Sequence, residues 1–403
     1  MMEDSLEEVH EELLAWAEGL GVRLQGIRPM RLSGRGFGVV ATDHVPRGTE
    51  VLTVPSSALR TKSTVPSAIS QNLPKDMTVH GLLAADIALN VAANTKKYAK
   101  WDAVVPSWDD IQQSMPLTWP TSLQNMLPTP AKNKFDKQQK NFEKDWSIVS
   151  DKFPFPGKDG IKASCTRDEY LYAWMLVNTR TFYFVTPQTE KLPKADHMAL
   201  QPVADLFNHT DTGGCAVTYD PEETYSFRTT KSYEKGEEVY ISYGTHHNDF
   251  LLVEYGFVLD KNVWDEVCLD EALLPALSQQ QKDDLEDVSF LGNYVLDKDT
   301  VCHRTQVALR SLLTGMRNGI SIDQWREFVN GLDDGEKSRK RADAVLVSLL
   351  KDYSSEVSDK MEELKDLKFE VDAESLNESR RGLLLLRWEQ IHQLVEDTIQ
   401  RLS

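Results

Sequence analysis

Apolar side chains recur at helical spacing at both ends of the chain. Near the start, one apolar residue appears every three or four positions, at Val9, Leu13, Trp16 and Leu20. This spacing predicts an amphipathic helix over residues 1–20. Ser5, with Glu8 three residues further on, has the pattern of a capping box, so we expect Ser5 to cap that helix. Near the end, the same spacing predicts one buried helical stripe, formed by Trp388, Ile391, Val395, Thr398 and Leu402.

Two stretches of the chain have the character of β-structure. Between residues 22 and 60, short runs rich in β-branched residues, such as 38–41 and 50–54, are separated by Gly and Pro turns. The same character returns over residues 198–258, notably at 217–219 and 238–242. We therefore expect one β-rich domain assembled from two separated stretches.

The region between these stretches is mainly helical in pattern. We expect one helix at 82–93, a lysine-rich helix at 131–147 and another helix at 167–179. Their apolar faces are predicted to carry Phe135, Phe142 and Trp146 in the second helix, and Tyr170, Trp174 and Val177 in the third. A helical insert at about 62–195 is thus predicted within the β-rich domain, and a further helical region follows from about residue 263.

Composition and charge narrow the functional class. The chain has 403 residues, of which 40% are hydrophobic and 27% charged, a globular composition with enough apolar material for two or more domains. Its formal net charge of −18 repels phosphate, so we expect neither a nucleic-acid ligand nor an anionic membrane. The acidity suits a basic partner, such as a lysine-rich protein segment, although it also serves solubility alone. We find no signal peptide and no apolar run of membrane-spanning length, so we expect an intracellular, soluble protein.

Metal sites are not suggested by the sequence. The four cysteines are scattered and form no C-x-x-C pair, which fits reduced thiols rather than a zinc knuckle. A site built from Asp205, His209, His246 and His247 remains an alternative, but adjacent histidines rarely point at one ion. The basic run at 337–341 fits either a nuclear signal or a solvated loop.

Several polar residues in apolar surroundings are candidates for chemistry. Asn208 and His209 end an apolar run, and a buried amide and imidazole need hydrogen-bond partners. The glycine-rich segment 34–38 precedes a strand rather than a helix, which excludes a dinucleotide-binding fingerprint and leaves a turn or a close approach to the main chain. Arg180 lies in an aromatic setting at the end of a predicted helix. Each feature alone also fits a structural role, so only their combination indicates a functional site.

In this order, the features resemble those of SET-domain protein-lysine methyltransferases of the Rubisco large-subunit methyltransferase-like branch. The resemblance runs through 36–41, 179–182, 202–209, 236–244 and 255–257. It implies an α+β class, with a β-rich SET fold of β-clip type, a knot-like crossing, a helical insert and a C-terminal all-helical domain. It also implies three parts: a helix at 1–20, a SET domain at 21–262 and a helical substrate-binding domain at 263–403.

The resemblance further implies S-adenosylmethionine as methyl donor and gives roles to individual residues. Tyr243 would be the catalytic tyrosine. The cofactor would be bound by Arg35, Gly36, Phe37, Thr179, Arg180, Asn208, His209, Tyr255 and Phe257. The lysine side would be lined by Arg180, Phe184, Asp205, Tyr219, Tyr243 and Tyr255. Thr179 stands where the branch commonly has serine, and it keeps the hydroxyl.

Three functions remain as hypotheses at this point. The first is methylation of a lysine amine in a non-histone protein, for example a basic ribosomal or translation protein, by a monomer in the cytoplasm or nucleus. The second is methylation of histidine, which Phe182 and the small Ala204 disfavour. The third is a catalytically inactive SET-fold binding module, which the retained Asn208, His209 and Tyr243 disfavour.

Overall fold

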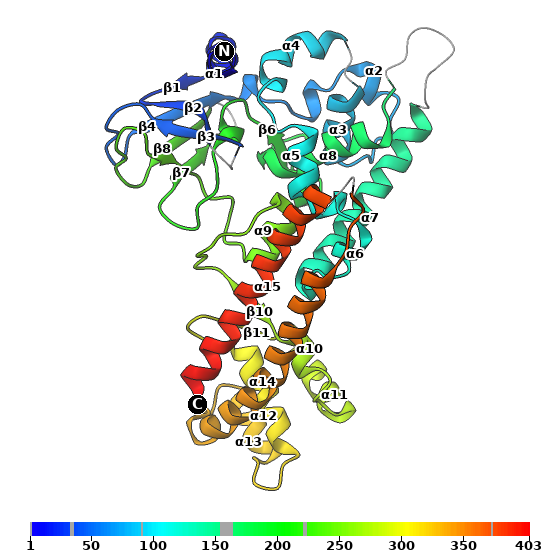
Figure 1. Cartoon of the computed structure of the whole chain (residues 1–403), viewed down its shortest axis with the longest axis vertical. Helices are drawn as coiled ribbons and strands as arrows, with labels where there is room; N and C mark the ends of the chain where they lie inside the picture. The colour runs from blue at the N-terminus through cyan, green and yellow to red at the C-terminus, as the bar shows by residue number, and fades with distance from the viewer. Residues whose placement is uncertain (1, 33–35, 90–91, 154–163, 221–223, 372–373) are drawn as a thin grey trace. The chain divides into compact units, whose positions relative to one another are not determined.

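The computed structural model describes residues 2–32, 36–89, 92–153, 164–220, 224–371 and 374–403 (Figure 1). The chain divides into two compact units. The first unit consists of Met1–Gln112 and Asp136–Thr245, and the second of Gln113–Phe135 and His246–Ser403. Each unit is therefore built from two separated pieces of sequence.

Helices occur in both units. In chain order they are α1 (Met2–Gly19), α2 (Ser67–Ser70), α3 (Val79–Leu89), α4 (Ala92–Asp102), α5 (Trp108–Ser114), α6 (Thr121–Gln124), α7 (Thr129–Lys152), α8 (Arg167–Arg180), α9 (Asn248–Tyr255), α10 (Asp270–Leu273), α11 (Gln279–Asp287), α12 (His303–Thr314), α13 (Ile322–Val329), α14 (Glu336–Asp366) and α15 (Glu374–Leu402). None of these described helices is long and apolar enough to cross a membrane.

The strands are short and concentrate in the first unit. They are β1 (Arg23–Leu24), β2 (Ile27–Leu32), β3 (Gly36–Ala41), β4 (Glu50–Pro55), β5 (Thr181–Tyr183), β6 (Met198–Leu200), β7 (Cys215–Tyr219), β8 (Thr224–Thr229), β9 (Glu238–Val239), β10 (Glu266–Cys268) and β11 (Val295–Asp297).

The first unit contains three small antiparallel sheets. Their strand orders are β1-β4-β8-β7, β2-β3-β9 and β5-β6. Strands from before the helical insert pair with strands from after it, as β4 does with β8 and β3 with β9. The predicted β-rich domain with a helical insert is therefore confirmed.

Two later segments of the first unit cross beside these sheets. Ile241 forms parallel bridges to both His209 and Cys215. Its amide donates to the Asn208 carbonyl at 3.0 Å, and its carbonyl accepts from the Thr210 amide at 2.9 Å. This pairing holds residues 208–215 against 240–241, as expected for the crossing of a SET fold.

The helical insert is anchored by hydrogen bonds from buried aromatic rings. The Tyr170 hydroxyl donates to the Gly81 carbonyl at 3.2 Å, and the Trp174 indole donates to Asp145 Oδ2 at 3.1 Å. A capping box formed by Thr166 and Glu169 begins α8. The helices predicted at 131–147 and 167–179 are thus confirmed as α7 and α8.

One detail of the helix prediction is wrong. The first helix begins at Met2, so Ser5 lies within it and does not cap it. The helix predicted at 82–93 falls on α3, described up to Leu89, and on the first residues of α4, described from Ala92; residues 90 and 91 lie outside the described part of the chain.

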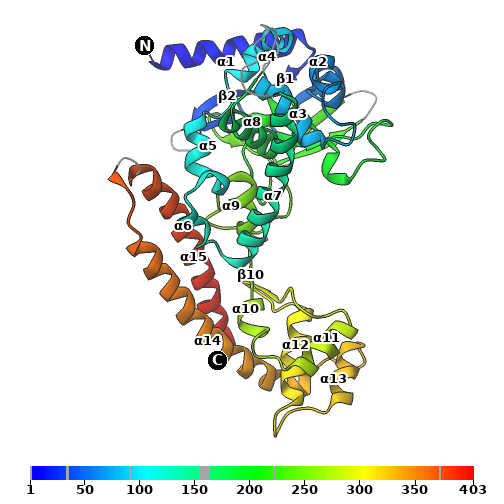
Figure 2. The same ribbon diagram turned by 90° about the vertical axis from the view of Figure 1, so that its right-hand side faces the viewer.

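The second unit is dominated by the long helices α14 and α15, which lie side by side (Figure 2). The predicted stripe on α15 is buried at Trp388, Ile391, Val395 and Thr398, and Leu402 is partly buried. The helical character of this region is confirmed. The unit also holds the antiparallel pair β10 and β11, whose three-residue strands are too short to give an alternating pattern.

A buried charge network lies in the core of the second unit. Arg387, 0% exposed, donates to Asp249 Oδ1 at 2.9 Å and Oδ2 at 3.0 Å, and to Asp265 Oδ2 at 2.7 Å. It also donates to the Glu266 carbonyl at 3.2 Å. These contacts join α15 to α9 and to the segment leading into β10, so one arginine stabilises three elements.

Candidate active site

Tyr243 is held by three contacts at the crossing of the first unit. Its hydroxyl donates to the Phe207 carbonyl at 2.7 Å, and its amide donates to His209 Nδ1 at 3.0 Å. The His209 and Tyr243 rings are stacked, with centroids 5.0 Å apart. Because the amide donates to Nδ1, that nitrogen is the acceptor, which fixes the orientation of the ring. The structure thus brings these two predicted site residues together.

Asn208 ties this crossing to strand β3. Its side-chain amide donates to the Phe37 carbonyl at 3.1 Å and to Glu238 Oε1 at 2.7 Å. A Cβ atom at Gly38 would lie 2.8 Å from Glu238 Oε1 and 3.1 Å from Asn208 Nδ2, so a side chain there would displace them. Gly38 is therefore required by close packing of polar groups against the main chain. Glu238, which also accepts from the Tyr240 hydroxyl at 2.7 Å, was not predicted as a site residue.

Arg180, the last residue of α8, lies against Asp205. Its Nη1 donates to the Asp205 backbone carbonyl and lies 3.7 Å from Asp205 Oδ2. Burial raises the pKa of Asp205 to about 6, although Arg180 and a 2.8 Å hydrogen bond from the Trp101 indole to Oδ2 oppose the shift. Trp101 was missed by the sequence analysis, because it lies 104 positions before the carboxylate and carries no motif.

Asp205 lies on a short 3₁₀ turn, η5 (Ala204–Leu206), that begins with a strained residue. Val203 has φ 68°, in the left-handed region that β-branched residues avoid. Such strain persists only where the surrounding structure enforces it, and it concentrates at functional sites. Here it orients the turn so that Asp205 faces Arg180 and the Phe207 carbonyl faces Tyr243.

A row of aromatic rings connects the predicted lysine-side residues Phe184 and Tyr219 to the crossing. Neighbouring centroids lie 4.3 to 6.5 Å apart, within the range of favourable ring contacts. In order, the rings are Phe184, Tyr219, Tyr225, Phe182, Phe227 and Phe207. The row ends at the residue whose carbonyl accepts from Tyr243.

The other predicted residues of the first unit have different surroundings. Gly36 begins β3 with φ 70°, a conformation that favours glycine. Phe37 packs its ring edge-on against His10, with centroids 5.0 Å apart. The Thr179 hydroxyl donates to the Met175 carbonyl of its own helix at 2.9 Å, a contact within α8. Arg35 lies outside the described residues.

Tyr255 and Phe257 lie in the second unit. Burial raises the pKa of Tyr255 to about 12, so its hydroxyl stays protonated. Its ring is 6.3 Å from that of Phe257. Gly256 between them has φ 78° and ends α9, and a Cβ there would lie 2.9 Å from the Met115 sulfur. The glycine of the Tyr-Gly-Phe sequence is therefore explained by the left-handed end of α9 and by the close packing there.

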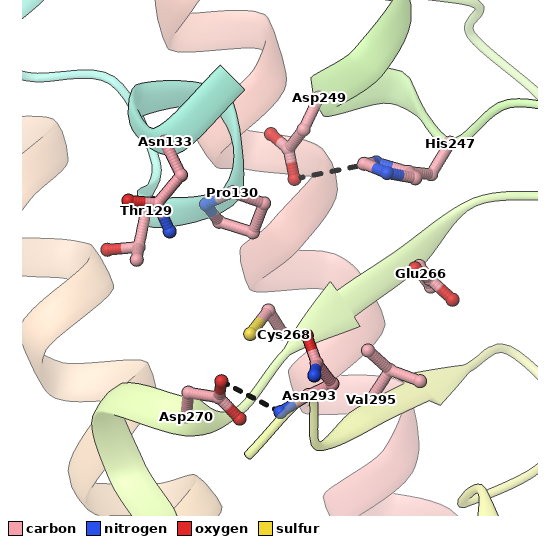
Figure 3. Close-up of a pocket in the computed structure, with 10 residues that line it drawn as sticks. All are labelled: Thr129, Pro130, Asn133, His247, Asp249, Glu266, Cys268, Asp270, Asn293 and Val295. Atoms are coloured by element: carbon pink, nitrogen blue, oxygen red, sulfur yellow. Dashed lines mark hydrogen bonds and ion pairs between the residues drawn. The ribbon is translucent and has the colours of Figure 1, made fainter. Parts of the chain in front are cut away.

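A separate pocket of about 280 Å³ lies in the second unit (Figure 3). It contains none of the residues predicted for the cofactor or lysine site; His247, from the alternative metal site, lines it. Its acidic side chains are Asp249, Glu266 and Asp270; Asp249 lies 4.0 Å from His247 Nδ1, and Asp270 accepts from the Asn293 amide at 3.0 Å. Among the described residues, no group of His, Cys, Asp and Glu could hold a metal ion.

The residues of the first unit fit a cofactor that carries a carboxylate. Arg180 is the cation, 14% exposed at the end of α8. Gly38, Asn208 and Glu238 pack closely against the main chain at Phe37. This set offers a charge-assisted contact and several neutral hydrogen-bonding groups, as binding of an amino-acid-bearing nucleoside requires.

Residues 36–244 match the SET domain family, and the chain belongs to it. Residues 265–401 match the Ribosomal lysine N-methyltransferase 2 C-terminal domain. The family consists of S-adenosylmethionine-dependent protein methyltransferases, so the predicted enzyme class, fold and methyl donor are confirmed.

The individual relatives of this chain have low sequence identity to it. Ribosomal lysine N-methyltransferase set11 of Schizosaccharomyces pombe is 29% identical over 51% of this chain and 54% of that protein. Actin-histidine N-methyltransferase of Danio rerio is 25% identical over 65% of this chain and 44% of that protein. The alignments thus span about half the length of these two relatives.

The fold has a close counterpart among solved structures. The SET domain of LSMT, solved with lysine and AdoHcy, superposes with a TM-score of 0.64 over 98% of this chain and 91% of that one. The sequences are 15% identical in this superposition, so the likeness is one of fold.

Proposed function

We propose that this chain transfers a methyl group from S-adenosylmethionine to the side-chain amine of a lysine in a non-histone protein. The observation that carries the proposal is the anchoring of Tyr243. Its hydroxyl, its amide and its ring are each held by residues 207–209 of the crossing segment. A hydroxyl fixed in this way is a preorganised group for orienting a reacting amine.

The chemistry explains why aromatic side chains surround the site. A lysine amine attacks only when neutral, and near pH 7.4 only about one lysine in a thousand is neutral, since its reference pKa is about 10.4. An apolar, ring-lined channel disfavours the ammonium and lowers that pKa. The row from Phe184 to Phe207 is largely buried and supplies the apolar packing behind such a channel.

The chain's own residues have distinct parts in this scheme. Tyr243 orients the amine, and Arg180 binds the carboxylate of the cofactor through a charge-assisted contact. Asn208 and His209 hold the main chain of the crossing in place. When bound, S-adenosylmethionine supplies an electrophilic methyl group on a positively charged sulfur. Arg35 and Thr179 belong to the same proposed cofactor site, and for Tyr255 and Phe257 the cofactor role is proposed from the resemblance alone.

The proposed substrate is a basic protein, such as a ribosomal protein. Two observations support this: the relative named above acts, by its name, on a ribosomal lysine, and the net charge of −18 favours a basic partner. We propose that the enzyme acts as a monomer in the cytoplasm or nucleus, with residues 263–403 as the substrate-binding domain.

Histidine methylation is the alternative, since a relative bears that name. Phe182, whose ring lies 6.0 Å from Phe227 and 6.5 Å from Tyr225, favours lysine because it leaves an apolar wall where an imidazole needs a polar partner. Mass spectrometry of the modified side chain distinguishes the two.

The direct test uses labelled S-adenosylmethionine and purified ribosomal proteins. Tyr243→Phe removes one hydroxyl, and we expect at least a roughly 100-fold loss of kcat, because an oriented group of this kind contributes about that factor. The matched control is Tyr233→Phe, which removes a buried hydroxyl that donates to the Gly213 carbonyl at 3.1 Å. We expect the control to retain its activity.

Full activity of Tyr243→Phe would refute the catalytic assignment. A wild-type protein that binds no S-adenosylmethionine in a calorimetric titration would instead support a binding module without catalysis.

A further inference from the structure

A second feature of the first unit lies beside Arg180 and Asp205. A cavity of about 20 Å³ is bounded there by residues of the helical insert and by Arg60, Leu200 and Asp205, which lie outside it. Its polar lining consists of Arg60, Trp101, Asp102, Arg180 and Asp205. The volume is enough for one water molecule, which requires about 10–15 Å³ by this measure.

Two buried polar atoms of this lining have no hydrogen-bond partner within the part of the chain that the structure describes. They are Asp205 Oδ1, on a side chain that is 1% exposed, and Arg180 Nε, on one that is 14% exposed. One is an acceptor and the other a donor. Leaving either atom unsatisfied in the interior costs stability, and a buried water that bonds to both removes that cost.

The charged groups around Asp205 come from several elements. Arg180 approaches it from the end of α8, and Asp102 lines the same cavity from the end of α4. Arg60 donates from Nε to Asp86 Oδ2 at 2.7 Å, and its Nη1 lies 3.6 Å from Asp102 Oδ1. Asp102 is 44% exposed, so it joins the cavity to solvent.

Asp205 also lies close in sequence to the group that holds Tyr243. Both Asp205 and Phe207 belong to the segment formed by η5 and its C-terminal residue, and the Phe207 carbonyl accepts the Tyr243 hydroxyl. Asp205 is therefore two residues before Phe207, the residue that accepts the Tyr243 hydroxyl at the proposed transfer point. At that point, every cycle must remove one proton from the ammonium of the substrate.

We propose that Arg180, Asp205 and Asp102 hold a water molecule in this cavity, and that Asp205 takes the proton of the substrate ammonium and passes it through this water to solvent. The proposal rests on the proposed lysine methylation. Asp102 is then a positioning residue that keeps the outer end of the path polar and open.

The step is balanced without any further reactant. The ammonium gives one proton to ionised Asp205, which leaves a neutral amine with its lone pair and a neutral carboxyl group. The carboxyl group gives that proton to the water, and the water gives one to Asp102 or directly to solvent. Asp205 returns to the carboxylate, and no electrons are transferred.

The acidity of these groups suits the task. Burial raises the pKa of Asp205 to about 6, with Arg180 and Trp101 opposing the shift and the charge of Asp102 adding to it. Near neutral pH most Asp205 is therefore ionised and ready to accept a proton, and a base with a pKa near the working pH is the most effective one.

The first test is structural and does not depend on activity. A crystal structure of the full chain, at a resolution that shows ordered water, should contain one water within hydrogen-bond distance of both Arg180 Nε and Asp205 Oδ1. If protein groups satisfy both atoms and no water is there, the proposal is refuted.

The second test is kinetic. Asp205→Asn should lower kcat by roughly 100-fold or more at neutral pH, the scale of a lost general base. Asp102→Asn should lower it by about tenfold at most, and it should move the acid limb of the kcat/KM profile to lower pH, because the charge of Asp102 raises the pKa of Asp205. Both losses should shrink towards alkaline pH, where the amine reaches the site already neutral.

The matched control is Asp109→Asn, an exposed carboxylate on α5 that does not line the cavity. It removes the same charge seven positions from Asp102, and its profile should match that of the wild type. An unchanged profile for Asp102→Asn, or full activity of Asp205→Asn, would refute the proton path while leaving lysine methylation intact. A wild-type protein without any transfer would refute both.

Discussion

Two arginines, one in each unit, differ in how fully the fold bonds them. Arg387 in the second unit is fully buried and donates to both oxygens of Asp249, to Asp265 and to the Glu266 carbonyl. Arg180 in the first unit is 14% exposed, donates to the Asp205 carbonyl and lies 3.7 Å from its carboxylate, and its Nε has no partner among the described residues.

This difference separates a structural arginine from a functional one. A buried guanidinium whose three nitrogens all donate to neighbouring acceptors holds elements of the fold together. A guanidinium with a free donor beside an incompletely bonded carboxylate costs stability, and such a cost is typical of binding and catalytic sites. We therefore expect a loss of stability when Arg387 is replaced, a gain of stability with a loss of function at Asp205, and an effect on cofactor binding at Arg180.

The largest effect is expected from Arg387→Met. The substitution leaves two carboxylates, 3% and 12% exposed, without their counter-charge. Removing one partner of a buried ion pair costs about 3–5 kcal/mol, and we expect that loss in the free energy of unfolding measured with urea. The control is Arg339→Met, an arginine 63% exposed and paired with Glu336, where about 1 kcal/mol or less should be lost. Equal losses for the two variants would contradict a structural role for Arg387.

The two arginines also differ in what the sequence reveals of them. Arg180 was predicted as a site residue because it belongs to an ordered series of motifs that ends at Tyr255 and Phe257. Arg387 lies on α15 within a helical pattern that predicts a buried face but gives no reason for a charge there. Its partners lie 122 and 138 positions earlier, so only the folded chain reveals them.

Prediction of the fold succeeded where a pattern is local. Helix α8 was expected over 167–179 and is found as Arg167–Arg180, because its apolar spacing is complete within one element. The crossing was anticipated only through the resemblance, since no periodicity reports that Ile241 pairs with His209 and Cys215. The Trp101 donor to Asp205 was missed for the same reason, because it is a contact between a helical insert and a distant turn.

The next largest effect is a gain of stability from Asp205→Asn. The pKa of Asp205 is raised from 3.8 to about 6 in the folded chain, so folding favours its neutral form. The sign follows from linkage: this contribution is fully present below about pH 4 and is lost as pH rises through about 6. Above that pH the wild type must keep a disfavoured charge buried, and asparagine removes it. We expect up to about 3 kcal/mol of added stability near pH 7.5, from a shift of about two pKa units at 1.36 kcal/mol each.

Unfolding of both proteins over a pH series checks this expectation. The stability difference between Asp205→Asn and the wild type should shrink as pH falls from about 6 to 4. A difference independent of pH would mean that the carboxylate is not strained by burial, and the contrast with Arg387 would then fail.

The smallest effect is expected from Arg180→Lys, which keeps the charge but replaces a planar fork by a point charge. The ammonium cannot both donate to the Asp205 carbonyl and present a second donor in the guanidinium geometry, so a bound carboxylate should lose one hydrogen bond. We expect affinity for S-adenosylmethionine to fall about tenfold in a calorimetric titration, which corresponds to about 1.4 kcal/mol. Thermal stability should change little, because one donor of this arginine has no hydrogen-bond partner among the described residues.

The matched control is Arg228→Lys, an arginine of the same unit that is 53% exposed and pairs with Glu50, and it should leave the affinity unchanged. If Arg180→Lys instead lowered stability without weakening the cofactor, Arg180 would be a structural residue like Arg387, and the distinction between the two would disappear.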